Sequence, residues 1–238
     1  MSHSINKISA KPDFQFRVPL LNTAYEFLEH YARHTPDAEA IVFQDQRLSY
    51  RNLKESVDSL AKSLLVAGIK PGDRVATLSA PHPDCSQILL ASLSIGAIWV
   101  GLNNRYQLSE MLHVITDSRP KILFSRSRIG ERIFVSEIKK LQESTVNFET
   151  VIIGDDQLVP DSISISEFSH GGIKISAEDL QERHKVVTGD TPCVIVYTSG
   201  TTGAAKGVLL KQSASVRHGK LALSEFKPNP LRVINYYP

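Results

Sequence analysis

The sequence contains little cysteine and carries almost no net charge. Two of its 238 residues are cysteines, and 27 Lys and Arg residues stand against 25 Asp and Glu residues, which leaves a formal net charge of +2. Cys85 and Cys193 each lie in an apolar run, and neither belongs to a pattern typical of a disulfide framework or a zinc site. A net charge this small does not indicate nucleic acid or an anionic membrane as a partner. We therefore expect no metal ligand set, no nucleic-acid partner and a reducing, cytoplasmic setting.

The chain also lacks a segment typical of a signal peptide or a membrane span. Residues 1–21 contain no apolar stretch after the first basic residue. Residues 85–104 carry no charge and are long enough to match a bilayer, but Ser, Gln and Asn side chains interrupt them. A buried helix that leads into a buried strand explains this segment better, and we expect no transmembrane segment.

What the sequence does contain is a polar, glycine-bearing segment set between two apolar runs. Residues 193–210 read CVIVYTSGTTGAAKGVLL, in which residues 194–197 predict a buried strand. The part that follows offers two glycines, four hydroxyls and the ammonium of Lys206. The glycines let the backbone turn several N–H groups inward, and together these donors favour an anion. A polyphosphate fits best, because each charge-assisted hydrogen bond to its oxygens contributes ~1.5–3 kcal/mol.

Other interpretations of this segment fit its sequence less well. A Walker A loop places lysine directly after its last glycine, whereas two alanines separate Gly203 from Lys206 here. A nucleophile elbow around Ser199 would require glycine where Tyr197 stands. A flexible linker stays an alternative, although a linker has no reason to lie between two apolar runs.

The first seventy residues predict two capped helices and a hairpin. Thr23 and Glu26 have the spacing of a capping box at the start of a helix that ends before Pro36. Residues 40–43 and 47–48 predict a short hairpin. Ser49 caps the next helix, and Gly68 ends it. The apolar face of that helix is formed by Leu53, Val57, Leu60 and Leu64.

From residue 70 onward, strands alternate with helices. The predicted strands are residues 75–78, 98–102, 122–124, 151–153 and 194–197, and the predicted helices are residues 84–95, 109–116 and 131–141. Residues 154–190 are polar and hold at most a short strand near Ile163 and a helix at residues 177–183. This alternation predicts an α/β fold with a parallel, helix-covered sheet. Ligands of such sheets bind at the carboxyl ends of the strands, where the polar segment lies.

The segment YTSGTTGAAKGV resembles the phosphate-binding signature of the acyl-adenylate-forming superfamily, the AMP-dependent synthetases and ligases. The segments LSYRNL, AGIKPGDRVA, GAIWVGLNNRY and LSEMLHVITDSRPKILF resemble the N-terminal half of a carboxylate-CoA ligase, most closely of the fatty-acyl type. The resemblance covers about residues 20–238 and is poorest over residues 147–187. Two departures stand out: Ala205 replaces the usual proline, and Lys211 and Gln212 replace a Thr-His or Ser-His pair.

The resemblance implies a two-step reaction and a set of site residues. ATP and a small carboxylic acid give an acyl-adenylate, and CoA then takes the acyl group as a thioester. Mg²⁺ would bridge the phosphate oxygens, and the sequence offers no obvious carboxylate ligand for it. The residues implied to bind the phosphates are Thr198, Ser199, Gly200, Thr201, Thr202, Gly203 and Lys206, and Lys206 is also implied to be catalytic.

The resemblance also implies a domain organisation. Residues 1–19 would be an N-terminal extension, residues 20–69 part of an incomplete second subdomain, residues 70–210 an α/β subdomain, and residues 211–238 the start of the second subdomain. Family members are longer, so the sheet of the large N-terminal domain is expected to be incomplete at its C-terminus. We expect the 238-residue chain to be inactive by itself. Two alternatives stay open: a non-catalytic nucleotide-binding or partner-binding remnant, and an adenylation domain that loads a carrier protein.

Overall fold

The fold is built on a seven-stranded sheet with the strand order β11-β10-β4-β3-β5-β8-β9. The computed structural model describes residues 20–154, 157–198 and 204–217. Every neighbouring pair in the sheet is parallel except β10 and β11, which are antiparallel. The strands are β3 (Arg74–Leu78), β4 (Ile98–Leu102), β5 (Ile122–Ser125), β8 (Glu149–Ile152), β9 (Ser162–Ser164), β10 (Pro192–Thr198) and β11 (Lys206–Lys211). The predicted α/β class with a parallel sheet is therefore confirmed, except that the edge strand β11 is antiparallel.

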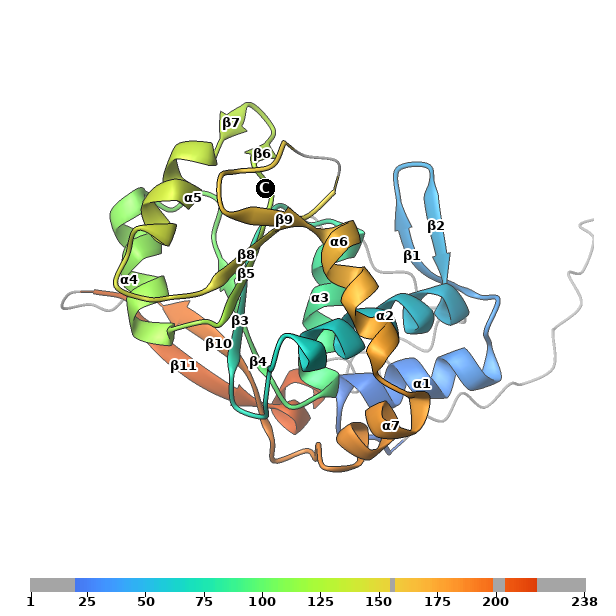
Figure 1. Ribbon diagram of the computed structural model, residues 1–238. Helices are drawn as coiled ribbons and strands as arrows, with labels where there is room; N and C mark the ends of the chain where they lie inside the picture. Colours follow the sequence, from blue (N-terminus) through green and yellow to red (C-terminus); the bar gives the residue numbers. More distant parts are fainter. Residues whose placement is uncertain (1–19, 155–156, 199–203, 218–238) are drawn as a thin grey trace, which may run out of the picture.

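Helices cover both faces of this sheet (Figure 1). On one face lie α4 (Leu108–Ser118) and α5 (Val135–Gln142), which contact each other. On the other face lie α2 (Tyr50–Val66) and α3 (Pro83–Ser94). Outside these two, α1 (Ala24–His34) contacts both of them, and α6 (Ile165–His170) and α7 (Ala177–Lys185) contact α2.

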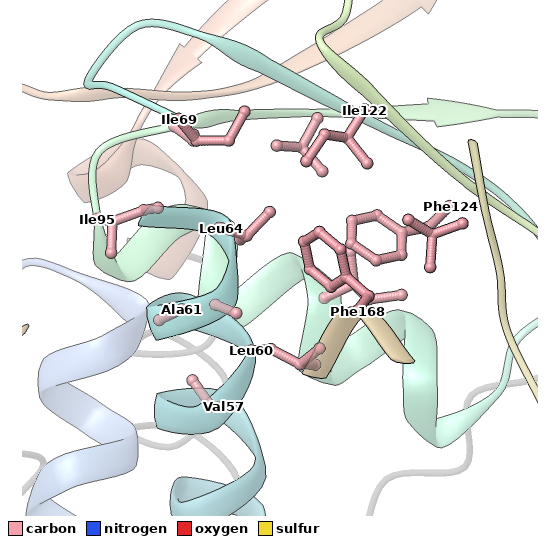
Figure 2. Packing of buried hydrophobic residues seen from close by; sticks show 14 of the residues in the cluster. Val57, Leu60, Ala61, Leu64, Ile69, Ile95, Ile122, Phe124 and Phe168 are labelled. Atoms are coloured by element: carbon pink, nitrogen blue, oxygen red, sulfur yellow. The ribbon is translucent and has the colours of Figure 1, made fainter. Parts of the chain in front are cut away.

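The alternation of side chains along the strands divides the core into two parts. Ile122 and Phe124 of β5 point to the cluster around α2 and α3, whereas Leu123 between them points to the cluster around α4 and α5. Figure 2 shows the first cluster, in which the rings of Phe124 and Phe168 lie edge to face with centroids 5.3 Å apart. Strands buried on both faces require near-continuous apolar runs, and β5, with all four residues buried, has such a run.

The predicted burial of residues 194–197 is wrong: none of these side chains is buried, and Val196 is 43% exposed. The reason is that β10 lies beside the edge strand β11, most of whose residues are exposed as well.

The predicted helix starts in the first seventy residues are confirmed. Thr23 accepts a hydrogen bond from the Glu26 N–H while the Glu26 carboxylate accepts from the Thr23 N–H, which completes the capping box of α1. The Ser49 hydroxyl accepts from the main chain at the start of α2, and Gly68 follows that helix with a φ of +80°. The predicted hairpin forms from β1 (Glu39–Phe43) and β2 (Gln46–Ser49).

The predicted helix over residues 131–141 begins too early, and this part of the prediction is wrong. The chain first makes a small hairpin of β6 (Arg128–Ile129) and β7 (Arg132–Ile133), and α5 begins only at Val135. Gly130 turns the hairpin with a φ of +58°, and the Phe134 N–H donates to the Ser127 carbonyl over 2.9 Å. These hydrogen bonds take the place of the first helical turn. The inward side chains expected from the pattern, Phe134, Ile138 and Leu141, are fully buried.

Residues 154–190 hold more structure than the sequence predicts. The short strand near Ile163 and the helix from Ala177 are confirmed as β9 and α7. Between them, α6 runs into the 3-10 helix η1 (Gly171–Lys174), and neither was predicted. Elements this short show no clear periodicity, and tertiary packing supports them instead. The Ser63 hydroxyl of α2 donates to the Ser169 carbonyl over 3.1 Å.

Candidate functional site

The two described ends of the predicted phosphate-binding segment lie side by side at the carboxyl edge of the sheet. Thr198 is the last residue of β10 and Lys206 is the first residue of β11, and the two are register partners across the antiparallel pair. Both side chains are exposed. Because β10 runs parallel to β4, this edge is also the one at which β3, β4 and β5 end. The other predicted site residues, Ser199, Gly200, Thr201, Thr202 and Gly203, lie outside the described residues.

The helix α4 contacts both ends of this segment. Before it, the Tyr197 hydroxyl donates a 2.6 Å hydrogen bond to Oδ2 of Asp117. After it, Nε2 of His113 lies 2.7 Å from the carbonyl oxygen of Ala205, and since a carbonyl can only accept, the ring nitrogen donates. Burial and the bond to Asp117 raise the pKa of Tyr197, so the phenol keeps its proton and stays a donor at neutral pH.

His113 and Asp117 were not predicted from the sequence. A signal was present, because these polar residues stand four apart in a helix whose Met111, Val114 and Ile115 are otherwise apolar and buried. Residues at that spacing share one side of a helix. Nothing local, however, shows that this side meets β10 and β11, which come about 80 residues later in the chain.

A small groove opens at the same edge, between β4 and β10. Its volume is about 250 Å³. The residues that line it are Trp99, Gly101, Leu102, Asn103, Tyr106, Ile195, Val196 and Tyr197. The Trp99 ring extends across Gly101, and its Nε1 donates a 2.9 Å hydrogen bond to Oγ1 of Thr77. The lining is mainly apolar and aromatic, with Asn103 as a polar side chain.

The turn that follows β4 is held in place from the neighbouring hairpin. The Arg132 guanidinium donates to the carbonyls of Asn104 and Tyr106, over 2.8 Å and 3.0 Å, and pairs with Glu137. The Asn103 side chain accepts from the Arg105 N–H over 2.9 Å. This turn places the exposed Arg105 just after β4, the strand next to β10. A second cationic side chain therefore lies at the same edge of the sheet as Lys206.

Metal-ligand clusters and membrane-spanning helices are both absent from the described residues. Within residues 20–154, 157–198 and 204–217, no group of three or more His, Cys, Asp or Glu side chains is arranged to hold a metal ion. No helix in that part of the chain is both long and apolar enough to cross a bilayer.

A mostly parallel sheet with helices on both faces defines an open α/β protein, a class whose ligands bind at the carboxyl ends of the strands. The model of the AMP-binding enzyme family matches residues 28–233, and the chain belongs to this family. Its fold corresponds to the N-terminal domain of adenylate-forming enzymes.

Curated relatives include ligases of two related kinds. A fatty acid–[acyl-carrier-protein] ligase of Streptomyces coeruleorubidus is 30% identical over 81% of this chain and 33% of the relative. The mitochondrial medium-chain acyl-CoA ligase of Macaca fascicularis is 28% identical over 90% of this chain and 38% of the relative. Bacitracin synthase 3 of Bacillus licheniformis is 28% identical over 84% of this chain and 3% of the relative. The chain therefore spans about a third of the length of the two ligases.

Solved structures show the same fold. Acetoacetyl-CoA synthetase of Streptomyces lividans superposes with a TM-score of 0.73 at 21% identity, over 85% of this chain and 32% of that one. The anthranilate CoA ligase that was solved with anthranoyl-AMP superposes with a TM-score of 0.68 at 20% identity, over 82% of this chain and 36% of that one.

Proposed function

We propose that this chain is the N-terminal, ATP-binding portion of a carboxylate-CoA ligase that forms an acyl-adenylate and then an acyl-CoA thioester. The observation that carries the proposal is the pairing of Thr198 with Lys206 at the carboxyl edge of a parallel sheet, with both side chains exposed. A hydroxyl and an ammonium placed on both sides of one hairpin connection suit a polyphosphate that lies between them.

The chemistry of adenylation gives these residues a role in the transition state. A carboxylate oxygen attacks the α-phosphorus of ATP while the bond from that phosphorus to the pyrophosphate oxygen breaks, so negative charge builds up on the departing pyrophosphate. Donors placed around the β- and γ-phosphates stabilise that charge. We assign this role to Lys206 and Thr198, together with Ser199, Gly200, Thr201, Thr202 and Gly203. Mg²⁺, when bound, would neutralise part of the same charge.

In the second step a thiol sulfur attacks the acyl carbonyl, and AMP leaves. CoA is the acceptor that we propose, since relatives named as acyl-CoA ligases match the chain over most of its length. A carrier protein is the second candidate, because an acyl-carrier-protein ligase and a bacitracin synthase also match. We propose a fatty or related carboxylic acid as substrate. A remnant that binds a nucleotide or a partner without catalysis stays the alternative.

The setting and domain division are proposals as well. Both cysteines are free thiols, and burial raises the pKa of each, which suits a reducing, cytoplasmic compartment. The proposed division is an extension at residues 1–19, a first segment at 20–69, the α/β subdomain at 70–210 and the start of a second subdomain at 211–238. Residues of α1 and α2 share one apolar cluster with β3 and β5, so the first segment and the α/β subdomain pack together.

The test of the phosphate site compares two lysines of β11. Lys206→Ala should weaken binding of ATP with Mg²⁺ at least about tenfold, or ~1.4 kcal/mol, because it removes a charge-assisted contact. Lys211→Ala is the matched control, since this exposed lysine stands at the opposite end of the strand and pairs with Asp190. Isothermal titration calorimetry measures both. Equal affinity of the two variants would contradict the proposal.

The second test measures catalysis. We expect the 238-residue chain to show no carboxylate-dependent exchange of labelled pyrophosphate into ATP, because orientation of the reactants supplies ~7–11 kcal/mol of barrier reduction and the chain spans a third of its relatives. The assay uses a panel of fatty and aromatic acids. Exchange that Lys206→Ala abolishes would show instead that the catalytic groups lie within these residues.

A further inference from the structure

We propose that His113 and Asp117 are positioning residues that fix both ends of the phosphate-binding segment to α4. The inference rests on the proposed function, since it assigns these side chains to the same site. A positioning role requires that each of the two contacts restrains the main chain at one end of the segment. The geometry at the two ends supports this.

At the first end, the Tyr197 ring is directed toward α4. Its hydroxyl lies 2.6 Å from Asp117, and the side of the ring contacts the backbone of β11. Gly207, the register partner of Tyr197, provides the space, because a Cβ at that position would lie 3.3 Å from Cζ of Tyr197 and 2.9 Å from Cγ2 of Ile195. A Cβ at position 207 would clash with Ile195 and crowd the Tyr197 ring. The exposed hydrogen bond between Tyr197 and Asp117 thus lies where three elements meet, β10, α4 and β11.

At the second end, His113 holds the main chain directly before Lys206. Its Nε2 donates to the Ala205 carbonyl over 2.7 Å, and the imidazole meets the Tyr197 ring edge-on with centroids 6.2 Å apart. The two anchored positions are thus also in contact with each other. Because the carbonyl of Ala205 belongs to the peptide unit that carries the Lys206 N–H, this bond restricts the direction in which Lys206 leaves the loop.

Both anchors stand on one rigid support. Met111, Val114 and Ile115 on the inward side of α4 are fully or almost fully buried against the sheet. The Glu110 carboxylate accepts from the Gln107 N–H over 2.8 Å at the start of the helix. A glycine-rich segment loses much conformational entropy when it binds a ligand. Anchors that fix its ends to a packed helix reduce that loss before the ligand arrives.

The experiment measures binding of inorganic tripolyphosphate with Mg²⁺ to the 238-residue chain by calorimetry. His113→Ala and Asp117→Ala should each raise the Kd about three- to tenfold, which corresponds to the loss of one hydrogen bond. His113→Gln should restore most of the affinity, because its amide nitrogen stands where Nε2 stood, whereas His113→Asn, whose amide is one bond shorter, should not. Thr116→Ala, at an exposed position of the same helix, is the control.

A second readout does not depend on a ligand. Hydrogen exchange of the peptide that covers residues 197–207 should be faster in His113→Ala than in the unmodified chain, and His113→Gln should restore the protection. Melting temperatures of all variants should stay within a few degrees of one another, since neither anchor belongs to the apolar core.

The outcomes separate the inference from the proposed function. If Lys206→Ala weakens tripolyphosphate binding and the His113 and Asp117 variants bind as the unmodified chain does, the positioning role is wrong and the phosphate site stands. If Lys206→Ala has no effect, the phosphate site itself is wrong. Unchanged exchange at residues 197–207 in His113→Ala would overturn the anchoring whatever the affinity.

Discussion

The side-chain amide of Gln212 donates a 2.9 Å hydrogen bond to the main-chain carbonyl of Leu93, which lies 119 residues earlier in the chain. Gln212 directly follows β11 and is fully buried, and Leu93 lies in the last turn of α3. The Gln212 N–H also donates to the Thr191 carbonyl, just before β10. Gln212 thus joins the start of β10 and the end of β11 to α3. These hydrogen bonds hold β11 at the end opposite Lys206.

We expect Gln212→Ala to lower the free energy of unfolding by about 2 to 3 kcal/mol, because it removes a buried hydrogen bond and leaves a cavity. The neighbouring Lys211→Ala, at an exposed position, should change it by less than about 0.5 kcal/mol. Urea denaturation of the three proteins measures the difference. Equal stability would mean that the Leu93 contact contributes nothing.

A methyl group at Gly101 should disturb the groove beside the phosphate segment. A Cβ there would lie 2.6 Å from Cη2 of the Trp99 ring, so Gly101→Ala must displace the indole and strain its hydrogen bond to Thr77. We expect a loss of about 1 to 3 kcal/mol in stability. Because Trp99 is the only tryptophan, its fluorescence reports the displacement directly. An unchanged emission spectrum together with unchanged stability would contradict this prediction.

The turn after β4 should depend on the shape of the Arg132 side chain and not only on its charge. Its guanidinium reaches two carbonyls and the Glu137 carboxylate together. The single ammonium of Arg132→Lys cannot make all three contacts in that geometry. We expect a loss of about 1 to 2 kcal/mol, against less than about 0.5 kcal/mol for Arg105→Lys, whose exposed side chain serves as the control. A result in which both variants unfold alike would argue against the clamp.

His184 should make the stability depend on pH. Burial lowers its pKa from 6.5 to about 4, while Asp58 opposes the shift and Lys54 adds to it. Its ring packs on Tyr25 with centroids 4.0 Å apart. Since the unfolded chain binds the proton more readily than the folded one, the contribution of His184 is complete above about pH 6.5 and is lost as the pH falls toward 4.

The measurement is urea denaturation at pH 7 and pH 5. Between these values the unmodified chain should lose about 1 to 2 kcal/mol more than His184→Leu, a range that allows for partial exposure of the ring. Gln181→Leu, at an exposed and uncharged position of the same helix, is the control and should lose as much as the unmodified chain. A pH dependence in His184→Leu that equals the unmodified chain's would assign the effect to other groups.

Local rules account for what the sequence predicted well. Thr23 and Ser49 start helices because their hydroxyls accept from N–H groups that lack helical partners, and Gly68 ends one because it adopts a positive φ. Apolar runs such as residues 122–124 predict strands because the central strands of a sheet covered on both faces bury nearly all of their side chains. The phosphate-binding role of the segment between Thr198 and Lys206 stays a prediction: its glycines and hydroxyls favour a polyphosphate over a linker, and the family resemblance strengthens that assignment.

The sequence did not determine which elements lie beside that segment. The pairing of β10 with β4 places β10 and β11 beside α4. Tyr197 then contacts Asp117, 80 positions earlier, and Ala205 contacts His113, 92 positions earlier. Such contacts form only when the whole sheet is assembled, since strand order is chosen by the burial of many apolar faces together and not by any local pattern. The small hairpin before α5 also depends on tertiary packing. The Phe134 N–H donates to the Ser127 carbonyl while the Phe134 ring is buried in the core. The sequence by itself thus predicted which residues donate to a phosphate, and the tertiary structure decided which side chains contact the two ends of that segment.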